Sequence, residues 1–304
     1  MPYNYADQFE QILVQKYESE QRSFPLFQSN PGISWLNAKT IKLPYITTSG
    51  YKDHARTGSF NSGSLTNNWE AKTLAHDRDV EFFIDSMDVD ETDLALSVAN
   101  ITNVFETEQA IPERDSYTFS KLFSEAGTYA ANGAVKDTTV LSAANILETF
   151  DGLMSTMDDA SVPMEGRLLF VTPAVQKLLK EAQGLTRFVH VDSDETRIRR
   201  YVHELDDVRI IPVPAARMKT SYDFTTGAVP ATGAGQLNLI LVHPDSVVAR
   251  MRHEYIRIFE PGSDSRTGDG YIYQNRAYWD AFLLSQRAAG IAINYTAGSG
   301  SGNV

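Results

Sequence analysis

Two short acidic segments contain the residues of this chain whose types could do chemistry. Asp88 and Asp90 follow an apolar run that ends at Ile84, and Gly268-Asp-Gly270 lies far along the chain. Carboxylates of this kind can hold Mg²⁺, and one of them can attack a phosphoryl group. The simpler interpretation is that the first acids begin a helix, where the helix dipole favours negative charge, and that the second segment is a turn.

The two segments resemble the first motif and the late metal-binding motif of haloacid-dehalogenase-type phosphatases. That resemblance would make the chain a Mg²⁺-dependent phosphatase with Asp88 as a candidate nucleophile. The sequence departs from the pattern, because Asp88 lies beyond the end of the apolar run and Tyr273 stands where a later acid is expected. No regular succession of strand, helix and strand follows either, so the phosphatase is kept only as an alternative.

Other catalytic patterns are absent from the sequence. It has no Gly-x-Ser-x-Gly elbow, no Walker loop, no His-Glu-x-x-His motif and no dinucleotide-binding fingerprint. With no cysteine, neither a disulfide nor a zinc-thiolate site can form. We therefore predict no catalytic, cofactor-binding or metal-ligating residues. The histidines are scattered, and none makes an i, i+4 pair with an acidic third ligand: His54, His76, His190, His203, His243 and His253.

The composition is that of a globular protein with a sizeable core. The chain has 304 residues, of which 42% are apolar and 22% charged, enough for one large or two medium domains. Its net charge of −12 argues against a general nucleic-acid binder, which usually carries a basic surface. A group of arginines is interpreted as solvated surface: Arg187, Arg197, Arg199, Arg200 and Arg209.

The sequence shows no targeting or membrane segment. Its N-terminus has no basic region followed by an apolar run, which a signal peptide would need. No apolar run approaches the roughly 20 residues that cross a bilayer. We therefore expect a soluble chain that starts in a cytosol and has no membrane partner.

Hydrophobic periodicity predicts a mixture of helices and strands. Residues 5–22 are expected to form an amphipathic helix with Phe9 and Tyr17 on its apolar face. Pro112 is expected to separate the next two helices, because proline breaks a helix interior. Further helices are predicted at 88–105, 119–130 and 146–157, and strands at 168–171, 208–214, 239–242, 255–259, 271–273, 278–285 and 290–295. Without a regular βαβ rhythm, this mixture indicates an α+β fold.

Two segments of the second half echo each other. Leu168 to Val175 and Leu239 to Val247 each read as a buried strand, a polar residue, a proline and a short helix. Thr172 and His243 stand before the prolines, where a helix cap is expected.

The stretch from Thr40 to Asp85 predicts a hairpin of unusual length. Strands are expected at 40–48 and 71–85, and the polar residues between them, 49–68, form its tip. Hairpin loops usually have about 2–5 residues, and this tip is too polar to build its own core. The hairpin therefore needs a surface outside its domain, most simply another subunit. Val80, Phe82 and Ile84 are expected to pack its base onto its own domain.

Several segments, taken in order, resemble one protein family. The chain has an N-terminal arm, a long hairpin and a helix before these motifs, which read Val162-Pro-x-x-Gly-Arg-Leu-Leu-Phe-Val-Thr-Pro173, Arg209-Ile-Ile-Pro-Val-Pro-Ala-Ala-Arg217, Asn238-Leu-Ile-Leu-Val-His-Pro-Asp-Ser-Val-Val248, Asn275-Arg-Ala-Tyr-Trp-Asp-Ala-Phe-Leu-Leu284 and Ala289-Gly-Ile-Ala-Ile293. This order resembles the major capsid proteins of tailed bacteriophages over nearly the whole chain.

The resemblance implies an HK-ninety-seven-like capsid fold of class α+β. Its parts would be an N-terminal arm at 1–39, an E-loop hairpin at 40–86, a peripheral domain at 87–136 with a spine helix near 106–131, an axial domain at 137–243, a return to the peripheral domain at 244–296 and a flexible tail at 297–304. Six side chains are expected at contacts between subunits: Tyr51, Lys52, Phe60, Trp69, Phe9 and Tyr17.

The same resemblance implies a function in a shell. Copies of the chain would assemble into hexamers and pentamers of an icosahedral shell around double-stranded DNA, which they enclose without sequence-specific binding. Scaffolding, portal or decoration proteins would be further partners, and the shell would be the virion capsid, assembled in the cytoplasm of a bacterial host. No long acidic or helical segment precedes the arm, so we expect no scaffolding domain within this chain.

Two points stay open at the level of the sequence. An encapsulin, a cellular compartment with the same fold, is an alternative to the phage shell. Some members of the capsid family crosslink an E-loop lysine to an asparagine of a neighbour, and Lys52 is the one lysine near the tip. No motif marks its partner or an activating acid, so the crosslink is not carried over to this chain.

Overall fold

The computed structural model describes residues 20–30, 39–54, 60–91, 98–182, 204–263, 266 and 268–298. Of the predicted helix at 5–22, only 20–22 lie within these residues, and they are not helical. The arginine group falls outside them apart from Arg209, which is exposed. The α-helices are α1 (Phe24–Phe27), α2 (Ser86–Glu91), α3 (Val98–Phe105), α4 (Ile111–Thr128), α5 (Ile146–Asp159) and α6 (Pro173–Glu181). A π-helical segment is η1 (Glu106–Ala110), and 3₁₀ turns are η2 (Ala130–Asn132), η3 (Ala215–Arg217), η4 (Pro244–Ser246) and η5 (Ser285–Gly290).

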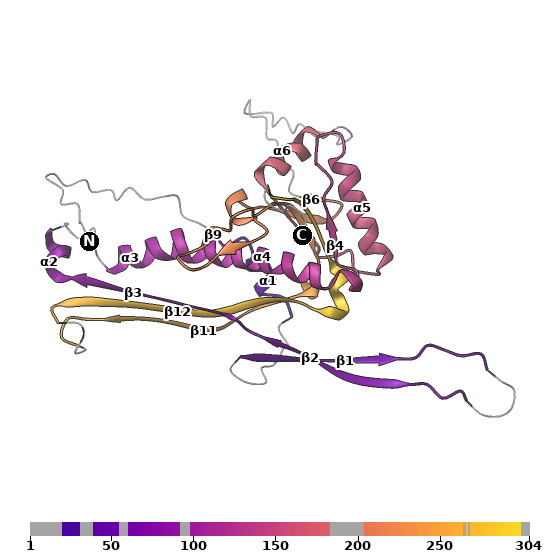
Figure 1. Cartoon of the computed structure of the whole chain (residues 1–304), viewed down its shortest axis with the longest axis horizontal. Coiled ribbons are helices and arrows are strands. Elements are labelled where there is room, and N and C mark those ends of the chain that lie inside the picture. Colours follow the sequence, from indigo (N-terminus) through magenta and orange to yellow (C-terminus); the bar gives the residue numbers. More distant parts are fainter. Residues whose placement is uncertain are drawn as a thin grey trace, which may run out of the picture.

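The strands within these ranges group into four sheets, and helices and sheets together give the α+β fold that the sequence predicts (Figure 1). The extended hairpin is β1 (Thr40–Thr48) with β2 (Leu65–Thr73). The spine sheet is β11 (Val247–Phe259), β12 (Gly270–Leu283) and β3 (His76–Asp85) in that order. The central sheet is β4 (Val135–Asp137), β13 (Ile291–Thr296), β10 (Gln236–Val242), β5 (Leu168–Val171), β7 (Val208–Pro212) and β6 (Glu204–Leu205) in that order, and β8 (Tyr222–Asp223) pairs with β9 (Val229–Pro230).

The central sheet is buried on both faces, which explains its continuous apolar runs. Leu168 and Phe170 face a core that contains residues of α4, whereas Leu169 and Val171 face a second core with residues of α5 and α6. Strands covered on both faces lose the alternation of polar and apolar residues. The sequence Leu168-Leu-Phe-Val171 is therefore a strand of four buried residues.

A long helix, the spine helix (98–128), lies over one face of the spine sheet (Figure 1). It overlaps the region where a spine helix is expected, but the predicted break at Pro112 is wrong. The π-helical turn before it, closed by the Ile111 N–H to the Glu106 carbonyl, shifts the hydrogen-bond register. Pro112 then falls in the first turn of α4, where its missing N–H needs no intrahelical partner.

The predicted return strand of the hairpin, 71–85, is two strands with different partners. Residues 65–73 pair with β1, whereas residues 76–85 cross to the spine sheet and pair with β12. Leu74 is buried at the junction, so the chain is fixed where it changes sheets. Val80, Phe82 and Ile84 pack on the body as expected, since Val80 is half-buried, Ile84 is buried and the ring of Phe82 contacts those of Phe105 and Tyr273. They belong to β3 of the spine sheet, however, and not to the base of the hairpin.

Most other predicted elements are present with altered ends. The strand predicted at 255–259 begins at Val247, and those at 271–273 and 278–285 are one strand, β12. The two echoing segments are confirmed as strand, cap and helical turn. Thr172 caps α6, and the ring nitrogen of His243 accepts the Asp245 N–H at the start of a single 3₁₀ turn.

Candidate functional site

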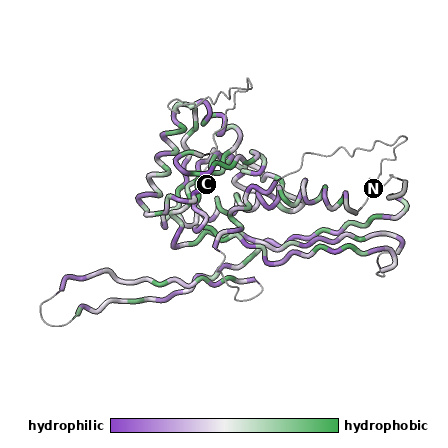
Figure 2. The backbone as a smooth tube through the Cα atoms, turned by 180° about the vertical axis from the view of Figure 1, so that it is seen from behind, coloured by the Kyte–Doolittle hydropathy of each residue, from purple (hydrophilic) through white to green (hydrophobic). Residues whose placement is uncertain are grey.

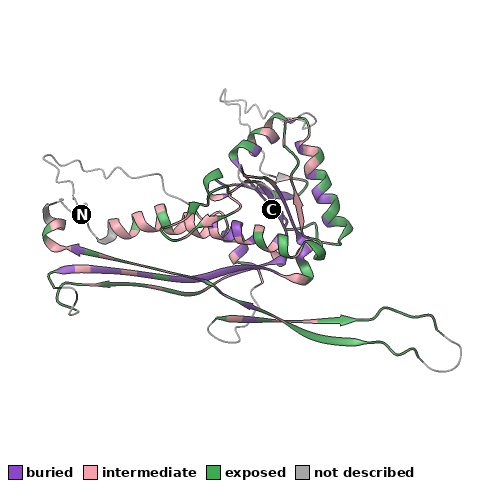
Figure 3. Cartoon of the chain, viewed as in Figure 1, coloured by how far each residue is buried: buried purple, intermediate pink, exposed green. Residues whose placement is uncertain are grey.

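The extended hairpin projects away from the body and is exposed along most of its length (Figures 1 and 3). Hydrophilic and hydrophobic stretches alternate along it (Figure 2). Opposite residues in an antiparallel pair point to the same face, so the strand register sorts its side chains into two faces. Pro44 opposite Trp69 and Ile46 opposite Asn67 define one face, which Leu65 continues opposite Thr48.

This apolar face of the hairpin (Pro44, Ile46, Leu65 and Trp69) has no cover within the described part of the chain. The exposed fractions are 63% for Ile46, 71% for Leu65 and 60% for Trp69. The opposite face carries Tyr45 with Asn68 and Thr47 with Thr66, so the hairpin is a two-faced ribbon. Apolar side chains gathered on one face of a projecting ribbon indicate an interaction surface.

The base of the hairpin packs on the body through its other face. Ile41 and Leu43 lie on the face opposite to Trp69, and Ile41 is buried with Leu74, Tyr278 and Phe282. At its base the hairpin therefore packs on the body with the face that carries Ile41 and Leu43. Beyond the base, the apolar face of the hairpin stays exposed.

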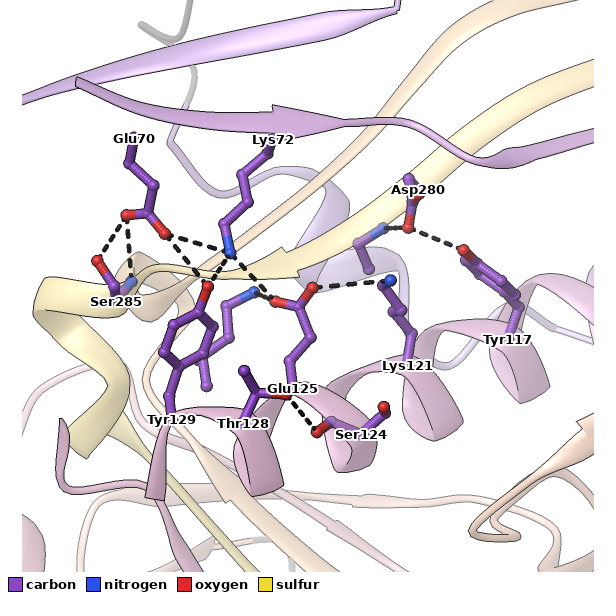
Figure 4. A network of polar contacts seen from close by, with 12 residues as sticks. Glu70, Lys72, Tyr117, Lys121, Ser124, Glu125, Thr128, Tyr129, Asp280 and Ser285 are labelled. Carbon is purple, nitrogen blue, oxygen red and sulfur yellow. Dashed lines mark hydrogen bonds and ion pairs between the residues drawn. The ribbon is translucent and has the colours of Figure 1, made fainter. Parts of the chain in front are cut away.

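A network of polar side chains fixes this base to the C-terminal end of the spine helix (Figure 4). The Lys72 ammonium donates to the Tyr129 hydroxyl at 2.6 Å and lies 3.2 Å from Glu70 and 3.6 Å from Glu125. Glu70 also accepts from the Ser285 hydroxyl at 2.7 Å. We call these residues the hairpin anchor: Glu70, Lys72, Lys121, Glu125, Tyr129, Asp280 and Ser285.

Two buried carboxylates extend the anchor to the spine sheet. Glu125 accepts the backbone N–H of Leu283 at 2.7 Å, and Asp280 accepts the N–H of Ala75 at 2.9 Å and the Tyr117 hydroxyl at 3.0 Å. Ala75 lies between β2 and β3, so Asp280 holds the junction at which the chain leaves the hairpin.

The anchor holds more carboxylates than ammonium groups, and this balance together with burial shifts the pKa values of three of its members. Burial alone would lower the pKa of Lys72, but the hydrogen bond to Tyr129 and the charges of Glu125 and Glu70 raise it above its usual 10.5. Burial raises the pKa of Glu125, against the Leu283 N–H and Lys72, and it also raises the pKa of Asp280. Lys72, Glu125 and Asp280 thus all hold their protons more tightly than they would in water.

A further buried carboxylate, outside the anchor, fixes the described part of the N-terminal arm. Asp115, fully buried on the spine helix, accepts the N–H groups of Arg22 and Ser23 and the Ser23 hydroxyl at 2.8–3.1 Å. The Arg217 guanidinium donates to the same carboxylate at 3.0 Å. This set ties the segment before α1 to the spine helix.

Four of the six predicted contact residues lie on the projecting hairpin. Tyr51 and Phe60 are fully exposed at the tip, and Trp69 lies on the apolar face. Lys52 is exposed, and its ammonium donates to the Ser62 carbonyl within the tip at 2.9 Å. Their contact with another subunit stays a prediction, and Phe9 and Tyr17 lie outside the described residues.

The acidic segments proposed for Mg²⁺ chemistry do meet, at the far end of the spine sheet. Asp85 pairs with Gly270, and the Ser86 hydroxyl donates to the Asp269 carbonyl. They meet across antiparallel strands, so no parallel sheet places carboxylates at neighbouring strand ends. The described residues contain no group of three side chains suited to holding a metal. The described residues therefore lack the parallel-sheet arrangement that the phosphatase alternative implies.

Comparison with solved structures decides the fold. A chain from Mycobacterium phage Che8 superposes with a TM-score of 0.66 at 10% identity, over 95% of this chain and 96% of that one. The chain has the HK-ninety-seven-like capsid fold. A chain from the capsid of cyanophage P-SCSP1u (TM-score 0.62, 12% identity) matches 97% of this chain and 94% of its own length. A chain from the mature capsid of bacteriophage PhiM1 (TM-score 0.62, 12% identity) matches 96% and 92%.

Among the comparisons with known proteins, only those with solved structures find the capsid fold. No family model and no curated protein matches the sequence. The likeness nevertheless spans more than nine tenths of both chains in each case, so hairpin, spine and central sheet are matched together. None of the helices in the described ranges is long and apolar enough to span a membrane.

The sequence did not reveal the hairpin anchor. Its members come from the hairpin, the spine helix and the end of β12, which are far apart in the chain. One signal was present, because Glu125 interrupts an apolar stripe formed by Leu122, Ala126 and Tyr129. A carboxylate on such a stripe requires a buried partner.

Proposed function

We propose that this chain is a major capsid protein, whose copies assemble into hexamers and pentamers of an icosahedral shell around double-stranded DNA. The observation that carries the proposal is the match to chains of phage capsids over more than nine tenths of both chains. In this proposal the shell is the virion capsid, built in a bacterial cytoplasm. Scaffolding, portal or decoration proteins are further partners, and the enclosed DNA is not read by sequence.

The extended hairpin supports this role physically. A shell subunit must present different surfaces to several neighbours, and a projecting ribbon extends its reach without enlarging its core. The apolar face of the hairpin is exposed in the single chain, whereas its base is anchored to the body. The ribbon is thus fixed at one end and presents its apolar face toward a neighbouring copy.

Substitutions on the two faces of the hairpin test the proposal. We expect Ile46→Ser with Trp69→Ser to abolish shells, because these residues form the apolar contact. The matched control is Thr66→Ala, an exposed residue on the opposite face. Both variants should unfold within about 0.5 kcal/mol of the wild type, since exposed positions contribute little to the single chain. Shells formed by the apolar-face variant as readily as by the wild type would contradict this role.

The encapsulin alternative is separated by what the shell contains. A phage shell encloses DNA, whereas an encapsulin encloses a protein cargo. Shells purified from cells should therefore be analysed for nuclease-protected nucleic acid and for a second protein. A stoichiometric enzyme cargo without DNA would replace the phage interpretation, and it would leave the shell function intact.

A further inference from the structure

The extended hairpin has two outer edges, and no strand in the described part of the chain pairs with either of them (Figure 1). Its two strands are paired from Thr40 with Thr73 to Thr48 with Leu65 without a shift in register, so both edges are regular. The edge of a strand carries backbone N–H and C=O groups that can pair with a further strand. Because the groups of an antiparallel pair alternate, the register fixes which residues point these groups outward.

Two backbone hydrogen bonds at the ends of the hairpin fix this alternation. The N–H of Leu74 donates to the Lys39 carbonyl at 2.9 Å, and the N–H of Ser49 donates to the Ser64 carbonyl at 3.0 Å. Every second pair between these two is hydrogen-bonded in the same way, and the pairs in between point their backbone groups outward. The outward groups therefore belong to the even-numbered residues of 40–48 in β1 and to the odd-numbered residues of 65–73 in β2.

The edge of β1 is interrupted at its centre. Pro44 is one of the residues whose backbone points outward, and proline has no N–H to donate. Lys42 places a charge two residues away on the same strand. Proline and charged side chains are the means by which natural proteins protect an edge strand from pairing. The β1 edge is therefore closed to a further strand.

The edge of β2 has no such protection. Its outward residues Leu65, Asn67 and Trp69 all have an N–H, and residues 65–69 include neither a charged side chain nor a proline. These residues are exposed, as are Ala71 and Thr73 nearer the base, so the edge is accessible along the strand. A regular, exposed and uncharged edge beside an apolar face is a site of aggregation unless a partner strand covers it. The difference between the two edges thus indicates that β2 is kept open for a partner.

The sequence of the β2 edge fits a second copy of itself. In an antiparallel pair centred on Asn67, the outward groups of both strands meet and exchange hydrogen bonds. Leu65 then lies opposite Trp69 of the partner subunit, and both side chains are on the apolar face of the hairpin. On the other face, Thr66 lies opposite Asn68 of the partner subunit. Apolar and polar side chains are thus matched on both faces, and no like charges lie opposite each other.

We infer that the β2 edges of two copies pair across a two-fold axis at Asn67, so that two hairpins form one sheet in the strand order β1, β2, β2, β1. The inference deepens the proposed function and rests on it, because it specifies how the hairpins of neighbouring copies meet. A two-stranded ribbon is marginally stable alone, whereas a sheet of more strands with an apolar face is stable. A two-fold contact uses the same surface on both copies and does not run around a ring, so this contact links copies of neighbouring capsomers.

A single cysteine tests the geometry directly, since the chain contains no other. The axis places residue 67 of one copy opposite residue 67 of the other, with Cα atoms about 5.5 Å apart, a distance that a disulfide spans. We therefore expect most chains of the assembled Asn67→Cys variant to form disulfide-linked dimers under mild oxidation, as seen on non-reducing gels. The matched control is Thr48→Cys, which is exposed on the β1 edge and should stay monomeric on the same gels.

A proline on either edge tests whether the backbone groups make the contact. Asn67→Pro removes the N–H donors at the axis, so we expect the association of copies to weaken by about tenfold in analytical ultracentrifugation. The matched control is Thr48→Pro, at an outward position of the β1 edge, which should associate as the wild type does. Neither substitution removes a hydrogen bond within the hairpin, and thermal unfolding by circular dichroism checks that both variants are folded.

Charged side chains at the axis distinguish the β2 strand of a second copy from any other partner strand. Asn67→Lys and Asn67→Asp each place like charges opposite each other in a pair of identical copies, which disfavours that pair. An equimolar mixture of the two variants places opposite charges there, so its association should recover to that of the wild type. With a different strand as the partner, mixing the variants would restore nothing.

Two results tell the edge contact and the proposed function apart. If the wild type assembles, but folded Asn67→Cys crosslinks no more than Thr48→Cys or the charged variants do not rescue each other, the edge contact is wrong and the proposed function stands. If Asn67→Cys forms the dimer but the wild type never forms capsomers or shells, the proposed function fails and the edge contact stands. A wild type that stays monomeric at all concentrations would overturn both.

Discussion

Replacing Lys72 by methionine tests whether the hairpin anchor holds the hairpin to the body. The Lys72 side chain is 10% exposed and pairs with Glu70 and Glu125. Removing one partner of a buried ion pair typically costs about 3–5 kcal/mol, because the remaining charge is uncompensated. Glu125 keeps Lys121 and the Leu283 N–H, and Glu70 keeps Ser285. We therefore expect Lys72→Met to lower the free energy of unfolding by about 2–4 kcal/mol at pH 7.

The loss should depend on pH in a defined direction. The pKa of Glu125 is higher in the folded chain than its unfolded value of about 4.5. Glu125 therefore lowers the free energy of unfolding as the pH rises from its unfolded pKa through its folded pKa. Without Lys72 the Glu125 carboxylate loses a neighbouring cation, so the destabilisation caused by its burial in the charged form increases. The destabilisation by Lys72→Met should hence be largest near neutral pH and smallest below the unfolded value, where Glu125 is protonated in both states.

Urea unfolding at several pH values, combined with Glu125→Gln, provides the assay. Glutamine keeps an oxygen for the Leu283 N–H but carries no charge. In a double-mutant cycle, Lys72→Met should therefore cost less in the Glu125→Gln background. A cost below about 1 kcal/mol at pH 7, or one that is equal in both backgrounds and at every pH, would refute the assigned role of the pair.

Three further predictions concern stability. Asp115→Asn should lower the free energy of unfolding by about 2–4 kcal/mol, because the side chain loses its charge and one of the two oxygens that accept hydrogen bonds from Arg22, Ser23 and Arg217. The exposed Asp151→Asn should change the free energy of unfolding by less than about 0.5 kcal/mol. Equal effects of the two substitutions would contradict the buried role of Asp115. Gly290→Ala should destabilise the folded chain by more than about 2 kcal/mol, since the added Cβ would collide with Ser246. Gly152→Ala should stabilise it by about 0.5–1 kcal/mol in thermal melts, because Gly152 lies in α5 with open space around the added Cβ. The stability from Lys72 is complete between neutral pH and pH 10.5. It should be lost as the pH rises through the higher folded pKa of Lys72, so the wild type should lose more stability than Lys72→Met in unfolding experiments above pH 10.5.

Local patterns in the sequence predicted the elements whose environment is uniform. The apolar run at 168–171 reads as a strand buried on both faces, and Thr172 before Pro173 reads as a helix start. The exposure of Trp69 also follows from its place in a polar hairpin with no core of its own. In each case the structure depends on interactions between residues that are close in the sequence, so a local sequence pattern is enough to predict it.

Features that depend on distant partners could not be predicted. The alternation of side chains from Ala71 to Asp85 continues without a break, yet the chain passes from the hairpin to the spine sheet at Leu74. Tyr278 packs with Leu74 and Asp280 accepts the N–H of Ala75, and both residues lie far along the chain. Similarly, Pro112 predicts a broken helix until the preceding π turn is known. The hairpin anchor combines residues from three distant segments, and no local pattern pairs Lys72 with Glu125.

Electron microscopy of the purified chain tests the central claim most directly. Protein expressed alone, or together with a scaffolding protein where one exists, should form closed icosahedral shells or rings of five and six copies. The extended hairpin of one copy should lie against its neighbour in the reconstruction. A chain that stays strictly monomeric at all concentrations, with the tip between β1 and β2 already ordered on its own, would contradict the account.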